Sequence, residues 1–171
     1  EEDHNAGQEI AFRRRRDMTV EDLVAKYAAE AKIAIQQEAA KRVAESTDPI
    51  VEARLRNTSL LTLLEDDELV PAILSRLGEV RAALDGHGGG ISVSSIEIIA
   101  SPDEKPSIDL ILDLTGACLS CGAAPGTLDG IKHDLESDDE VYRVRFSAKL
   151  LESFDELGRE FILAHGSVTF V

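Results

Sequence analysis

The sequence predicts a mixed α/β (α+β) protein, in which a small α-β-β-α-β sandwich follows an α-helical N-terminal region. Apolar residues recur at helical spacing in the first half of the chain, and they alternate at strand spacing in short segments of the second half. Turns rich in glycine or acidic residues separate these segments. We therefore expect an N-terminal helical extension over residues 1–64, an α/β domain over residues 65–147 and a C-terminal extension over residues 148–171.

The first predicted helix begins after Thr19, an N-cap residue with an acidic residue, Asp22, three positions later. It is expected to run to about Val43. The basic block before it, residues 13–16, is interpreted as a solvated segment. Because the apolar stripe of this helix is thin and rich in alanine, we expect it to pack against another helix or another chain. The stripe consists of Val20, Val24, Tyr27, Ala31 and Ile35.

Two further helices are predicted before the first strand. Asp48 followed by Pro49 is the expected N-cap and first residue of the second helix, and residues 57–59 are expected to divide it. Its predicted buried residues are Ile50, Leu55, Leu60, Leu61 and Leu64. The third helix follows the acidic segment 65–68, and its predicted buried residues are Leu69, Ile73, Leu77, Val80 and Leu84.

Gly86, Gly88, Gly89 and Gly90 are expected to end the third helix, and a strand is expected from Ile91. Apolar residues alternate again from Ile108 to Leu114, so the connection at residues 101–106 predicts a hairpin. A helical stripe follows at Thr127, Leu128, Ile131 and Leu135, and residues 141–146 alternate as a third strand. In the C-terminal extension, Leu150, Leu151, Phe154 and Leu157 have helical spacing, and residues 167–171 are compatible with a strand.

The composition limits the partners of this chain. A formal net charge of -15 argues against nucleic acid or an anionic membrane as the main partner. No apolar run approaches the length of a membrane span, and the N-terminus has no signal-type apolar block. We therefore expect a cytoplasmic protein.

The strongest chemical signal is the pair Cys118 and Cys121, the only two cysteines of the chain, in a glycine-flanked turn. A reducing cytosol disfavours structural disulfides, so this spacing favours a metal-binding or redox pair. Two thiolates are half of the four ligands that a tetrahedral thiolate site or an iron–sulfur cluster needs. A second copy of the chain is the simplest source of the other two, which predicts a homodimer.

The residues around this pair resemble the NifU-like domain, an iron–sulfur scaffold and carrier family. Residues 84–91 read Leu-Asp-Gly-His-Gly-Gly-Gly-Ile, similar to the family's Gly-Gly turn at the end of a helix. Residues 114–121 read Leu-Thr-Gly-Ala-Cys-Leu-Ser-Cys, and the family's Thr-Leu pair follows at Thr127. The resemblance extends over about residues 67–146, and Gly90 stands where the family usually has Asp.

This resemblance implies a NifU C-terminal-domain type of fold and an iron–sulfur function. Cys118 and Cys121 would bind a 4Fe-4S cluster shared between two subunits, and the protein would pass that cluster to acceptor iron–sulfur apoproteins. The cysteines would act as ligands, so we do not expect an enzyme.

Three other interpretations stay open. The same C-x-x-C pair suits a thiol–disulfide redox protein. A structural zinc site is a second option, because the interval from Cys121 to His133 is close to zinc-finger spacing, although no second histidine follows at the required distance. In a third interpretation the N-terminal helices form a protein-interaction module. His87, in the glycine turn, is a further candidate ligand beside the cysteines.

Overall fold

The computed structural model describes residues 19–86, 88–100, 105–116 and 124–171. The backbone divides into two compact units, Glu1–Glu38 and Ala39–Val171. The described residues form seven α-helices, one 3-10 helix and three strands, which confirms the predicted mixed α/β class. None of the helices in these residues is both long and apolar enough to cross a membrane.

Helix α2 (Val20–Ser46) begins where the sequence predicts. The Thr19 N–H donates to Asp22 Oδ2 at 3.0 Å, and the Asp22 N–H donates to Thr19 Oγ1 at 3.1 Å. This reciprocal cap holds the first turn, and its hydrogen bonds lower the pKa of Asp22. No residue of α2 is buried, and the predicted apolar stripe is exposed along its whole length.

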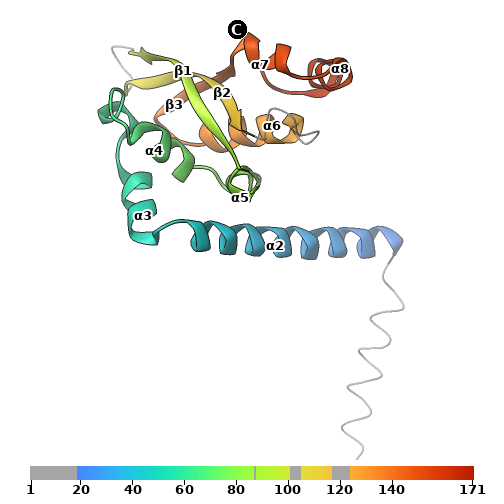
Figure 1. The fold of residues 1–171 in the computed structure, drawn as a ribbon. Coiled ribbons are helices and arrows are strands. Elements are labelled where there is room, and N and C mark those ends of the chain that lie inside the picture. Colours follow the sequence, from blue (N-terminus) through green and yellow to red (C-terminus); the bar gives the residue numbers. More distant parts are fainter. Residues whose placement is uncertain (1–18, 87, 101–104, 117–123) are drawn as a thin grey trace, which may run out of the picture. The chain divides into compact units, whose positions relative to one another are not determined.

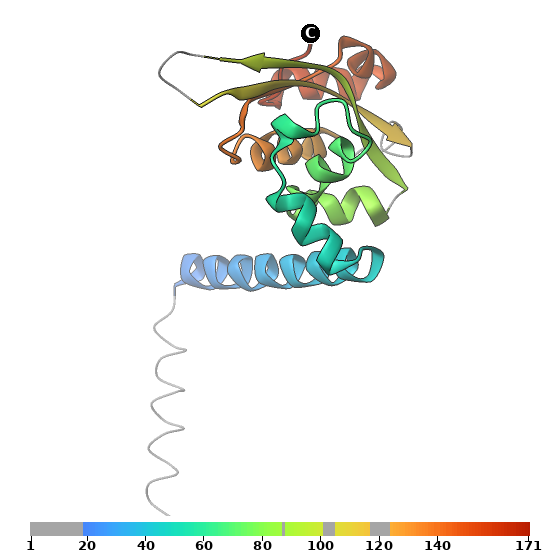
Figure 2. The same cartoon turned by 90° about the vertical axis from the view of Figure 1, so that its left-hand side faces the viewer.

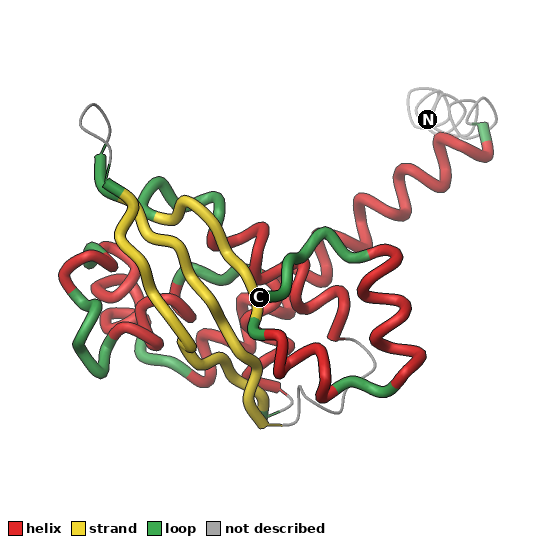
Figure 3. The backbone as a smooth tube through the Cα atoms, turned by 90° about the horizontal axis from the view of Figure 1, so that it is seen from above, coloured by secondary structure: helices red, strands yellow, loops and turns green. Residues whose placement is uncertain are grey.

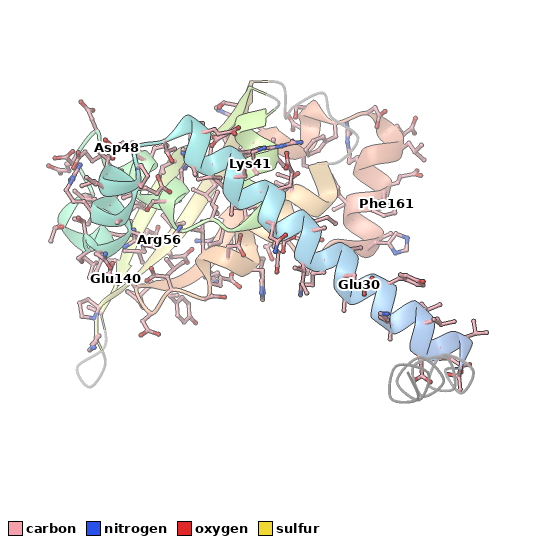
Figure 4. The ribbon with its side chains drawn as sticks, turned by 90° about the horizontal axis from the view of Figure 1, so that it is seen from below. Glu30, Lys41, Asp48, Arg56, Glu140 and Phe161 are labelled. Carbon is pink, nitrogen blue, oxygen red and sulfur yellow. The ribbon has the colours of Figure 1, made fainter. Side chains whose placement is uncertain are left out.

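Helix α3 (Pro49–Asn57) also begins as predicted, because Asp48 Oδ1 accepts hydrogen bonds from the N–H groups of Ile50 and Val51. The predicted break is confirmed, since η1 (Leu60–Thr62) follows as a separate turn. Figure 4 shows Asp48 at the start of α3. The prediction that Ile50 is buried is wrong, because this residue is 81% exposed. It precedes the buried Leu55 by five positions, which on an α-helix turns it about 140° away from that side chain.

The single helix predicted after residue 68 is wrong: the structure has two, α4 (Leu69–Ser75) and α5 (Glu79–Gly86). Arg76 ends α4, because its buried guanidinium donates to carbonyl oxygens of α3 and α4. The Gly78 N–H then donates to Asp134 Oδ2 at 2.8 Å. Tertiary contacts of the segment between the helices therefore interrupt a continuous helical pattern.

The sheet contains β1 (Gly89–Ile99), β2 (Ser107–Gly116) and β3 (Val141–Phe146), in that spatial order. Figure 3 shows the three strands side by side. β1 and β2 pair antiparallel, which confirms the predicted hairpin, while residues 101–104 of its loop lie outside the described residues. β2 and β3 are parallel and are joined through α6 (Ala124–Leu135). The order α5-β1-β2-α6-β3 confirms the predicted sequence of elements.

The core lies between one face of the sheet and helices α4, α5 and α6, which Figure 1 shows below the strands. Alternate residues of β2 from Ile108 to Leu114 point into it, as predicted. The predicted stripe of α6 faces them, with Leu128, Ile131 and Leu135 fully buried. These contacts fix the end of β2 and the start of α6, the two segments that flank the cysteine pair in the sequence.

The C-terminal segment forms α7 (Ala148–Ser153) and α8 (Glu156–His165), in agreement with its helical spacing. The strand considered for residues 167–171 is reduced to one parallel bridge, between Phe146 and Phe170. Figure 2 shows these helices beside the strands. The predicted boundaries at residues 64 and 147 both lie within the unit Ala39–Val171. Its core takes residues from each side of them: Leu55, Leu60 and Leu63 before the first, and Leu150, Phe154 and Ile162 after the second.

Candidate functional site

Both predicted ligands, Cys118 and Cys121, belong to residues 117–123, which lie outside the described residues. The structure does define the two ends of this segment. β2 ends at Gly116, two residues before the first cysteine, and α6 begins at Ala124, three residues after the second.

The glycine turn lies beside the first of these ends. β1 begins at Gly89, and the strand register pairs Gly89 with Gly116 and Gly90 with Thr115. Gly88, immediately before β1, and Gly116 both have positive φ, at 64° and 66°. The two sequence motifs, about thirty residues apart in the chain, thus meet at one end of the hairpin. His87, the further candidate ligand, lies outside the described residues.

This end of the hairpin is open to solvent, since Gly88, Thr115 and Gly116 are all exposed. On the other side of the cysteine segment, Gly126 in the first turns of α6 is exposed as well. The first N–H groups of a helix have no intrahelical acceptor, and together with the helix dipole they favour a thiolate nearby. The described flanks on both sides of the cysteine segment are therefore accessible to a partner protein.

Helix α6 packs against the core and against α5. Gly130 packs against α5, where an added Cβ would lie 3.4 Å from the Cβ of Val80. Thr127, in the second turn of α6, is half-buried. The start of α6 is consequently fixed relative to α5, the helix that ends at the glycine turn.

The described residues offer no competing metal site: they contain no group of three or more His, Cys, Asp or Glu side chains that could hold a metal ion. His133 lies on the exposed side of α6 beside a polar pocket of about 310 Å³. The carboxylates of this pocket already have partners, because Asp129 accepts hydrogen bonds from Ser167 and Glu136 accepts one from the Val144 N–H. His165, on α8, packs its ring against Phe161 at 4.9 Å between centroids. Phe161 can be located on α8 in Figure 4.

Sequence reasoning missed a buried ion cluster on the opposite face of the sheet. Asp109 is 1% exposed and accepts hydrogen bonds from Arg143 and Arg145 of the neighbouring strand. Burial alone would raise the pKa of Asp109, but the hydrogen bonds and positive charges of the two arginines outweigh it, so the pKa is lowered. Asp109 pairs with Glu97 of β1. It lies seven residues before Gly116 in β2, which corresponds to roughly 24 Å along the strand. The cluster is therefore remote from the cysteine segment.

Comparison of the chain with protein family models, curated proteins and solved structures finds no match.

Proposed function

We propose that this protein is an iron–sulfur cluster scaffold or carrier of the NifU-like type. Cys118 and Cys121 supply two thiolates, a second subunit supplies two more, and the 4Fe-4S cluster is the cargo that passes to acceptor apoproteins. The main support is the register that pairs Gly89 with Gly116. It brings the glycine turn and the start of the cysteine segment to one exposed end of the hairpin, which suits ligand exchange with an incoming protein.

The donor set fits this cargo. Thiolate is the ligand that iron–sulfur clusters use, and two residues between the cysteines allow both to bind one cluster. The chain has two cysteines, so a second copy of the chain is the simplest source of the remaining two thiolates. The mixed sheet with a helix joining its parallel strands agrees with the order of elements that the resemblance implies.

Anaerobic reconstitution with iron and sulfide tests this function. Wild-type protein is expected to gain a visible chromophore and about two iron atoms per chain, and to sediment as a dimer. Cys118→Ser and Cys121→Ser should each abolish the chromophore. Ser120→Ala, which keeps both thiols, is the matched control and should load like wild type. A colourless monomer whose two thiols cycle through an intramolecular disulfide would instead favour the redox function.

A second role, protein interaction through α2, is supported by one observation. Every described residue of the unit Glu1–Glu38 is exposed, including Val20, Val24, Tyr27 and Ile35. Isolated helices gain most of their stability from packing an apolar face, so a long helix without buried residues is suited to a partner. A truncation that starts at Ala39 separates this role from cluster binding, because it keeps the whole core. Loss of dimer mass with retained cluster uptake would assign α2 to assembly.

A further inference from the structure

Two glycines at the end of the hairpin face each other, and the structure requires each for a different reason. Gly88 and Gly116 are the only residues with positive φ in the described ranges, where side chains with a Cβ are strained. At Gly88 this is the whole requirement, since an added Cβ would meet nothing within 4 Å. At Gly116 an added Cβ would also lie under 3.0 Å from the carbonyl oxygen of Gly88, closer than Cβ atoms are found.

The contact at Gly116 is between backbone and backbone. Its next nearest neighbours are the carbonyl carbon of Gly88 and the Cα of Gly89, both at 3.3 Å from the added Cβ. Neither can move aside by rotating a side chain. The case of Gly90 is different, because its added Cβ would meet Thr115 Oγ1 at 2.9 Å, and that hydroxyl can change rotamer. A side chain is therefore excluded most strongly at Gly116.

We propose that Gly116 is a positioning residue for the cysteine pair. By lacking a Cβ it lets the end of β2 lie directly against the Gly88–Gly89 backbone, and this contact sets the point from which the chain continues to Cys118, two residues on. Residues that support the ligands of a metal site commonly affect metal affinity about 10- to 100-fold, so a shift of this backbone is expected to weaken cluster binding while both thiols are kept. The inference rests on the proposed function.

Paired substitutions separate the two requirements. Gly88→Asn tests positive φ alone, because asparagine visits the left-handed region, and it should keep the cluster lifetime within about twofold of wild type. Gly116→Asn meets the same φ but places a Cβ against Gly88, so it should lose cluster to a chelator about ten- to hundredfold faster. Gly116→Ala should behave like Gly116→Asn. Gly126→Ala, on the far side of the cysteine segment and with open space around its Cβ, is the matched control and should resemble wild type.

The readouts are cluster lifetime under chelator, the visible circular dichroism of the loaded protein, and the thermal midpoint of the apo protein. A shortened lifetime in both Gly116 variants, with helical circular dichroism retained, supports the positioning role. Wild-type lifetime in Gly116→Asn overturns it. If wild type itself takes up no cluster, the proposed function fails, and the backbone contact is then tested in the apo protein alone.

Amide hydrogen exchange provides that test, and it also decides the matter if the Gly116 variants do not fold. In wild-type apo protein, the amides that pair residues 89–91 with residues 114–116 should exchange more slowly than those pairing residues 97–99 at the other end, despite their exposure. Gly88→Asn and Gly126→Ala should preserve this pattern. Equal or faster exchange at the glycine end in wild type would show that no fixed contact exists there, and would overturn the inference.

Discussion

Replacement of Asp109 by asparagine keeps the shape of the side chain and removes the charge that two arginines share. Asp109 is 1% exposed, and it accepts hydrogen bonds from Arg143 Nε at 3.0 Å and Arg145 Nε at 3.1 Å. Breaking a buried pair by removing one partner costs about 3–5 kcal/mol. Here the cost should be smaller, because the Arg143 side chain is 49% exposed and can be solvated, whereas Arg145 is 17% exposed. We expect Asp109→Asn to lower the free energy of unfolding by about 2 kcal/mol.

The assay is urea unfolding followed by circular dichroism, at pH 7, 5 and 3. The control is Asp113→Asn on the same face of β2. Among the described residues Asp113 accepts a hydrogen bond from the exposed Ser94 hydroxyl at 3.0 Å, so this substitution should change the free energy of unfolding by less than about 0.5 kcal/mol. The folded-state pKa of Asp109 is lowered, so its contribution is present above the unfolded-state pKa of about 3.9 and is lost as the pH falls through the folded-state value. The difference from wild type should thus be full at pH 7 and 5 and smaller at pH 3. Equal stabilities at pH 7, or a difference that persists unchanged at pH 3, would refute the reasoning.

Three further predictions concern the scaffold. Arg76→Gln should lower the free energy of unfolding by about 3 kcal/mol, because it removes the buried guanidinium that donates to Asp138 Oδ2 and to the carbonyl oxygens of Leu55, Thr58 and Ala72. An unchanged urea midpoint would contradict this. A chain that starts at Ala39 should keep the unfolding midpoint of the full chain, whereas one that starts at Glu65 should not fold, because it lacks Leu55, Leu60 and Leu63 of the core; thermal melts of the two truncations check this. Gly126→Ala should raise the free energy of unfolding by about 0.5 kcal/mol, since it improves helix propensity without meeting a neighbour, and a lowered thermal midpoint would argue against the exposed position of this residue.

The fold was predictable wherever a local rule and a tertiary contact agree. Asp48 caps α3, the alternation from Ile108 to Leu114 forms β2, and residues 141–146 form β3 with the predicted bounds. In each case the same residues satisfy both the local hydrogen bonds and the core. The order of strands and helices was predictable because a short loop joins β1 to β2 as a hairpin, and a single helix, α6, joins β2 to β3.

The sequence-based predictions are wrong or incomplete where contacts with residues far apart in the sequence determine the structure. The break between α4 and α5 depends on the burial of Arg76 against other segments and on Asp134, which lies in α6, and neither is visible in the pattern of residues 69–86. Asp109 sits at an outward position of a strand, where an acid is expected to be solvated, and only the pairing of β3 brings two arginines over it. Periodicity does not report such contacts, because they come from residues far apart in the sequence.

The candidate site divides in the same way. The cysteine pair, the glycine turn and the following helix were all recognisable as sequence motifs. The distinction between Gly88 and Gly116 was not, because it depends on which residues the hairpin register places together. Composition identifies a glycine; only the paired backbone shows that one of the two is also needed for close approach.

The residues after α8 have a consequence for self-association. Phe146 donates its N–H to Thr169 O at 2.8 Å and accepts from the Val171 N–H at 2.9 Å, so the last residues cover the outer edge of β3 where that strand ends. β1 is the opposite edge strand, and in the described residues its strand partner is β2 alone. An uncovered edge invites strand addition from another molecule, and β1 contains neither lysine nor proline to discourage it. Its irregularity between Val93 and Ser95 and the charge of Glu97 are the features that oppose sheet extension, so substitutions there bear on aggregation more than on folding.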